Sequence, residues 1–143
     1  ITRTFSKIYG LAGLRIGYAL CSAEIADLMN RVRQPFNCNN LALTAAIAAL
    51  DDHQFVASSY ALNRSGMAQI VGGLKRLGCT HIPSHGNFLT FRAADAHLVN
   101  QKLLKQGVIV RPIASYGMPE WLRVTIGTES ENARFLTALE GAL

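Results

Sequence analysis

The residues best suited to do chemistry lie near the start of the chain, around Lys7. Apolar side chains surround this lysine in the sequence, among them Phe5, Ile8 and Leu11. Apolar surroundings favour the neutral form of an amine, and a neutral amine is a nucleophile toward carbonyl carbons. We therefore expect Lys7 to be an enclosed amine that reacts with a carbonyl compound.

Donors suited to a phosphate group lie on both sides of Lys7. They are the hydroxyls of Thr4 and Ser6 and the guanidinium of Arg15. A reactive amine beside a phosphate site is what pyridoxal phosphate requires, because its aldehyde condenses with a lysine amine. The alternative is a buried strand, turn and strand with two incidental basic residues, since a Ser-Lys pair alone is a weak motif.

This segment resembles the cofactor-lysine segment of the fold-type I aminotransferases, which depend on pyridoxal phosphate. The resemblance is strongest to the histidinol-phosphate aminotransferases, and it continues to the last residue of the chain. It implies that Lys7 carries the cofactor and moves protons in catalysis, while Thr4, Ser6 and Arg15 bind the cofactor phosphate. The stretches that carry it are Thr4-Phe5-Ser6-Lys7 and Gly10-Leu11-Ala12-Gly13-Leu14-Arg15-Ile16-Gly17-Tyr18.

Two arginines farther along the chain form a second candidate site. Arg111 lies near the end of a predicted strand over 108–112, and Arg123 lies inside another over 121–126. Strand alternation places Leu122 and Val124 on one face and Arg123 on the other. An arginine in a short apolar strand needs an anionic partner. That partner is either a carboxylate, such as Glu120 or Glu140, or a ligand.

The resemblance favours a ligand. In these aminotransferases the arginine of a Leu-Arg-Val/Ile-Thr/Ser-Ile-Gly motif binds the anionic end of the substrate, and that arginine matches Arg123. A strand-end arginine that assists in the histidinol-phosphate enzymes matches Arg111. The implied reaction exchanges an amino group between histidinol phosphate and 2-oxoglutarate. Three readings stay open: an aromatic amino-acid aminotransferase, a threonine-phosphate decarboxylase, and an aminotransferase-like effector domain of a transcription regulator.

The composition favours a globular protein, since 143 residues of which 50% are hydrophobic can bury one core. The resemblance implies an α/β fold, namely the C-terminal part of a fold-type I transferase. Residues 1–60 are expected to be a remnant of the large cofactor-binding domain. Residues 61–143 are expected to be a small α+β domain with helices packed on a short sheet. A buried parallel sheet needs more strands than residues 1–6 supply, so we expect a portion of a longer protein that is inactive alone.

The net charge of +5 raises the possibility of a nucleic-acid or membrane partner. The basic residues are dispersed, however, so we expect anionic small molecules as ligands and neither of those partners. Cys21, Cys38 and Cys79 form no C-x-x-C pair and are odd in number, which favours a cytoplasmic protein without disulfides or a metal site. The family resemblance implies a homodimer for the full-length protein.

Local signals predict the remaining elements. Residues 1–5 are expected to be the end of a buried strand, and residues 14–21 a second strand after the turn. Glycines at 10, 13 and 17 are expected to allow positive φ and close approach of the backbone where the chain reverses. Ser22 is expected to cap a helix that ends near Val32, and the alanine-rich segment 41–50 to form a helix buried on several sides. A long helix is predicted over 53–77, with Gly66, Gly72 and Gly73 weakening or bending it. The other predictions are strands at 80–83, 87–91, 108–112 and 121–126, a helix that Asp95 caps and that runs to Gln106, and a final helix opened by a capping box at Thr128–Glu131.

Overall fold

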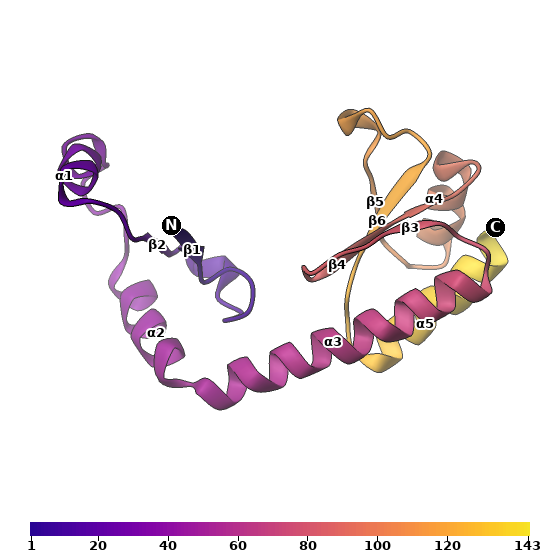
Figure 1. Cartoon of the computed structure of the whole chain (residues 1–143), viewed down its shortest axis with the longest axis horizontal. Coiled ribbons are helices and arrows are strands. Elements are labelled where there is room, and N and C mark those ends of the chain that lie inside the picture. Colours follow the sequence, from indigo (N-terminus) through magenta and orange to yellow (C-terminus); the bar gives the residue numbers. More distant parts are fainter. The chain divides into compact units, whose positions relative to one another are not determined.

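The computed structural model describes all 143 residues, which form two compact units, Ile1–Tyr60 and Ala61–Leu143. Both units contain helices and strands (Figure 1). Each unit has a hydrophobic core of its own. The predicted α/β fold class is confirmed.

The first unit begins with a small antiparallel sheet. Strand β1 (Thr2–Thr4) pairs with β2 (Gly17–Ala19), and the predicted strand, turn and strand are thereby confirmed. The prediction that the first strand is buried was wrong for this chain, because all three residues of β1 are exposed. The sheet has only two strands, and the side chains on both of its faces are exposed.

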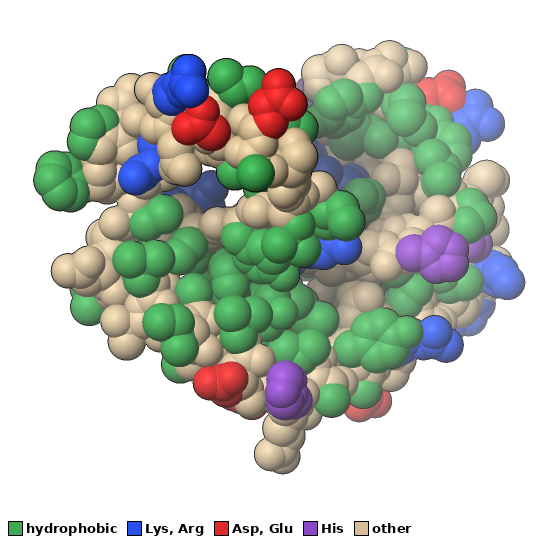
Figure 2. Space-filling model, turned by 60° about the vertical axis from the view of Figure 1, so that its left-hand side comes forward, with side chains coloured by type: hydrophobic (Ala, Val, Ile, Leu, Met, Phe, Trp, Pro, Cys, Tyr) green, Lys and Arg blue, Asp and Glu red, His purple; other side chains and the backbone are tan.

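Two short helices follow this sheet in the first unit. Helix α1 (Ala23–Val32) is capped by Ser22, as predicted, and α2 (Asn40–Asp51) is capped by the side chain of Asn39. The expected burial of α2 on several sides was wrong. Its buried residues are Ala42 and Ala46, which belong to the same core as Phe5 and Ile16. Large apolar side chains of α1 and α2 lie at the surface. Figure 2 shows hydrophobic side chains spread over the face that is turned forward there.

Helix α3 (His53–Arg76) confirms the predicted long helix. The Asp52 carboxylate accepts a hydrogen bond from the Phe55 amide at 2.9 Å, and Gly78 follows the helix with a φ of +69°. Positive φ is the conformation that a glycine adopts easily after a helix. No helix of the chain is both long enough and apolar enough to cross a membrane.

Four antiparallel strands form the sheet of the second unit, in the order β3-β4-β6-β5. The strand predicted over 108–112 is shorter, because only Arg111 and Pro112 pair with β6. The Val108 amide instead donates to the Leu103 carbonyl at 3.0 Å, which ties this segment to the end of a helix. The four strands are β3 (His81–Ile82), β4 (Phe88–Arg92), β5 (Arg111–Pro112) and β6 (Trp121–Thr125).

Helices cover one face of this sheet. Helices α4 (Ala96–Lys105) and α5 (Glu129–Ala142) contribute buried side chains to the same core as the inward residues of β4 and β6. Phe91 of β4 meets Phe135 of α5 edge-on, with ring centroids 5.7 Å apart. The predicted arrangement of helices on one face of a short sheet is confirmed, as is the capping box at the start of α5. The opposite face of the sheet carries the two arginines of interest.

Candidate active-site residues

Lys7 lies in the turn that follows β1. The turn is closed by hydrogen bonds from the Gly10 amide to the Lys7 carbonyl and from the Leu11 amide to the Phe5 carbonyl, each 2.9 Å long. The expected enclosure of Lys7 was wrong in this chain, since its side chain is exposed. Phe5 turns into the core and Ile8 turns outward, so neighbours in sequence do not cover the amine.

The predicted phosphate ligands lie together beside this lysine. Arg15 Nη1 donates to Ser6 Oγ at 3.4 Å and to the Ala12 carbonyl at 2.7 Å, while Thr4 Oγ1 accepts from the Ser6 amide at 3.0 Å. A guanidinium has five N–H donors, and the two contacts leave others available. Two hydroxyls and a cation in one place fit the demands of a phosphate group next to an amine.

The backbone at Arg15 has an uncommon conformation. Its φ of +53° places it in the left-handed region, directly after a short 3-10 helix at Ala12–Leu14. For a residue with a Cβ this conformation costs on the order of 1–3 kcal/mol. At Gly17 the requirement is for space, because a Cβ there would lie 2.6 Å from the Arg3 carbonyl oxygen across the strand pair. The predicted close approach at this glycine is therefore confirmed.

The second pair of residues, Arg111 and Arg123, stands on neighbouring strands. The two are direct partners in the register of β5 and β6, so their side chains leave the same face of the sheet. Leu122 and Val124 are buried on the opposite face, as predicted. Arg123 is half-buried and Arg111 is exposed. Two guanidinium groups on one face provide a site for an anion that carries more than one negative charge.

The structure argues against Glu120 as the partner of Arg123. Arg92 of β4 forms a salt bridge with Glu120, and its Nε donates to Glu120 Oε2 at 2.7 Å. Arg123 lies instead over the ring of Phe88, with Cζ 4.8 Å from the ring centroid. Sequence reasoning missed this contact. The outward position of Phe88 on its strand was the only available signal, and the strand register decides which residue it meets.

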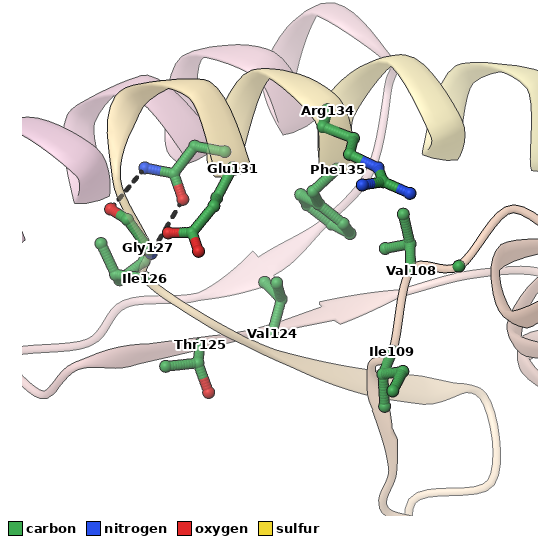
Figure 3. Close-up of a pocket in the computed structure, with 11 residues that line it drawn as sticks. Val108, Ile109, Val124, Thr125, Ile126, Gly127, Glu131, Arg134 and Phe135 are labelled. Carbon is green, nitrogen blue, oxygen red and sulfur yellow. Dashed lines mark hydrogen bonds between the residues drawn. The ribbon is translucent and has the colours of Figure 1, made fainter.

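A separate cavity of about 500 Å³ lies in the second unit, between α5, β6 and the segment 107–109 (Figure 3). None of the predicted site residues lines it. Three of its polar side chains already have structural partners. Glu131 accepts from the Thr128 amide at 2.7 Å, Asn132 Oδ1 accepts from the Gly127 amide at 2.9 Å, and Arg134 donates to the Gln106 carbonyl at 3.1 Å. The two hydrogen bonds from Thr128 lower the pKa of the Glu131 carboxyl.

Comparison with known proteins gives a consistent result. Residues 1–139 match the family described as aminotransferase class I and II. Histidinol-phosphate aminotransferase 1 of Dechloromonas aromatica is 78% identical over 143 residues, which is all of this chain and 40% of that protein. The histidinol-phosphate aminotransferase of Methylobacillus flagellatus is 61% identical over all of this chain and 39% of its own length.

Solved structures agree with these relatives. The histidinol-phosphate aminotransferase from Sinorhizobium meliloti, solved in complex with pyridoxal-5'-phosphate, superposes with a TM-score of 0.91 at 27% identity. The match covers 99% of this chain and 40% of that chain. The chain thus spans about two fifths of the length of the relatives that it matches. Because the family match extends over nearly all of its residues, the chain belongs to the class I and II aminotransferases.

Proposed function

We propose that this chain is the C-terminal portion of a pyridoxal phosphate-dependent aminotransferase that exchanges an amino group between histidinol phosphate and 2-oxoglutarate. The observation that carries the proposal is the grouping of Ser6 and Arg15 beside Lys7, with Arg15 Nη1 3.4 Å from Ser6 Oγ. It occurs in a chain that is 78% identical to a protein named histidinol-phosphate aminotransferase. The names of the relatives support the substrate, and the pyridoxal-5'-phosphate complex of the Sinorhizobium meliloti protein supports the cofactor.

Lys7 has the central role in this proposal. Its amine would hold the cofactor aldehyde in the resting protein. Once the incoming substrate amine has displaced it, the freed Nζ would take the proton from the substrate α-carbon. The bound cofactor supplies an electron sink for the negative charge that develops at that carbon. Thr4, Ser6 and Arg15 hold the phosphate group throughout, so the ring stays fixed relative to Lys7.

Arg111 and Arg123 recognise the substrate in this proposal. Their direct pairing across β5 and β6 favours a phosphate group, because a doubly charged anion can accept hydrogen bonds from both guanidinium groups. The same two residues accept a carboxylate when the amino donor or acceptor is a dicarboxylic acid. We assign Arg123 the larger share of the binding energy for this anion. Arg123 is half-buried, and charge-assisted hydrogen bonds are stronger where water is excluded.

The proposal extends to the organisation of the full-length protein. Residues 1–60 belong to the large cofactor-binding domain and 61–143 form the small domain. The full-length protein is a cytoplasmic homodimer, and the 143 residues alone are inactive. The exposed apolar side chains of α1 and α2 support the expectation that the first unit packs against further protein.

Two measurements on the full-length protein test the proposal. The first compares the rate of transamination of histidinol phosphate with that of phenylalanine or tyrosine. It also measures the rate of decarboxylation of threonine phosphate. We expect kcat/KM to be highest for histidinol phosphate with 2-oxoglutarate as acceptor. The second is borohydride reduction followed by peptide mapping, in which the label is expected on Lys7. A label on another lysine, or a clear preference for an aromatic amino acid, would refute the assignment.

A further inference from the structure

The contact between Arg123 and Phe88 has a specific geometry. In the register of β4 and β6, Arg123 is opposite Thr90, and Phe88 is the diagonal neighbour on the same face. The guanidinium carbon lies 4.8 Å from the centroid of the Phe88 ring, within the range of a cation–π contact. Phe88 is 38% exposed, so its ring borders the open face of the sheet and is not part of the core.

The other neighbours of Arg123 do not hold it in place. Arg111 stands directly opposite and carries the same charge, which disfavours a close approach of the two side chains. Glu120, the acidic residue nearest in sequence, is engaged by Arg92. The ring of Phe88 is therefore the group that attracts the Arg123 guanidinium when no anion is bound.

An aromatic ring and a carboxylate contact an arginine side chain in different ways. The N–H donors of a guanidinium point outward in its plane, whereas an aromatic ring contacts the π-face of the group. A carboxylate partner would use two of these donors, but a ring uses none. Arg123 over Phe88 is thus restrained while its donors stay available to a ligand.

From these contacts we infer that Phe88 is a positioning residue for Arg123, one that orients the guanidinium so that its N–H edge receives the anionic group of the substrate. This inference rests on the proposed role of Arg123 in anion binding. It adds a residue from β4 to a site that the sequence motifs place on β5 and β6. Phe88 itself touches no reacting atom in this role.

The test uses the full-length enzyme loaded with pyridoxal phosphate and compares F88L, F88M and F88Y with the parent protein. Loss of the ring in F88L and F88M is expected to raise KM for histidinol phosphate about fivefold, the size of one cation–π contact, with kcat changed by less than about twofold. The inhibition constant of inorganic phosphate should rise by the same factor. F88Y keeps the ring face and should restore both values.

Matched controls separate this role from a general effect on folding. I82A removes another exposed apolar side chain from the same face, on β3, and is expected to leave KM and phosphate inhibition unchanged. Two non-aromatic replacements are included so that the result does not depend on one variant remaining folded. Unchanged phosphate inhibition in F88L and F88M, or equal losses in F88Y and F88L, would overturn the inference.

A further variant, R123Q, distinguishes failure of the inference from failure of the proposed function. If R123Q weakens phosphate inhibition but F88L does not, Arg123 binds the anion and Phe88 has no positioning role. If R123Q also leaves phosphate inhibition unchanged, the proposed anion site itself is wrong. In the expected case, F88L has no additional effect in an R123Q background, because the two residues act through the same guanidinium.

Discussion

Arg111 stands directly opposite Arg123 across the β5–β6 pair. Like charges at such positions destabilise an antiparallel pair, and unlike charges or uncharged residues do not. No salt bridge to Glu120 relieves the repulsion, because Arg92 engages that carboxylate. The pair is therefore unfavourable in the protein without an anion, and an anion held between the two guanidinium groups would relieve the repulsion.

The first prediction concerns the stability effect of this pair. R111Q is expected to raise the free energy of unfolding by about 0.2–1 kcal/mol in phosphate-free buffer, because it removes a like-charge contact. The same substitution should reduce the increase in Tm that added phosphate causes in the parent protein. Thermal unfolding with and without phosphate measures both effects. R92Q is the control, since it breaks the pair with Glu120 and should not stabilise the protein; a loss of stability in phosphate-free R111Q would contradict the prediction.

The second prediction concerns two adjacent glycines in α3. A Cβ on Gly73 would collide with the Leu136 side chain of α5, whereas a Cβ on Gly72 meets nothing within 4 Å. G73A is therefore expected to lower the free energy of unfolding by about 1–3 kcal/mol, the range for an overpacked core position. G72A should raise it by about 0.5–1 kcal/mol, because alanine is the better helix former.

Chemical denaturation of G73A and G72A, measured side by side, gives the free energy of unfolding of each variant. Because the residues are neighbours on one helix, each serves as the control for the other. Equal effects of the two substitutions would contradict the close packing of α3 against α5 at Gly73. Gly66 has a similar role, since a Cβ there would lie 2.6 Å from the Ile126 side chain.

The third prediction concerns the reactivity of Cys79. This thiol is buried in the core of the second unit, and burial raises its pKa by disfavouring the thiolate. Since the thiolate is the reactive form, Cys79 is expected to react slowly with iodoacetamide at pH values of about 7–8 in the native protein. Mass spectrometry of modified peptides, before and after denaturation, measures this reactivity. Rapid native labelling of Cys79 would show that this part of the core opens readily.

The fourth prediction concerns the capping box of α5. Hydrogen bonds from Thr128 lower the pKa of Glu131 in the folded protein below its ordinary value of 4.5. The ionised carboxylate therefore stabilises the fold fully at pH values above about 4.5, and this contribution is lost as the pH falls through the lowered folded-state pKa. E131Q should destabilise the protein at neutral and mildly acidic pH, with a smaller effect at more acidic pH.

Urea unfolding of the parent protein and E131Q at several pH values measures the difference. A matched comparison in a T128V background should show a weaker pH dependence, because one of the two hydrogen bonds to the carboxylate is then missing. A difference between the parent protein and E131Q that stays constant into the acid range would contradict the lowered pKa of Glu131. Such a result would mean that the capping hydrogen bonds form but that the charge of Glu131 adds nothing to the stability.

Much of the local structure followed from sequence signals. The caps at Ser22, Asp95 and Thr128 were predicted with their helices, and the structure confirms each of them. Capping residues and strand alternation act over three or four positions, so a short stretch of sequence contains all the information that they need. For the same reason, strand alternation was enough to assign Arg123 to the face opposite Leu122 and Val124.

The environment of single side chains depended on the tertiary structure. Lys7 was expected to be enclosed because its sequence neighbours are apolar, yet it is exposed because Phe5 turns inward and away from it. Gly66 and Gly73 were expected to weaken or bend α3, and the structure places Gly73 against Leu136 of α5 and Gly66 against Ile126. These features depend on contacts between residues far apart in the chain, which periodicity does not encode.

By itself, the sequence determined the α/β class, the positions of most helices and strands, and the motifs around Lys7 and Arg123 that indicate an aminotransferase. Only the tertiary structure decided that Arg111 opposes Arg123, that Arg92 engages Glu120, and that Phe88 lies against the Arg123 guanidinium. The physical reason is that strand register aligns residues from separate segments. A shift of one residue would move every side chain of a strand to the other face.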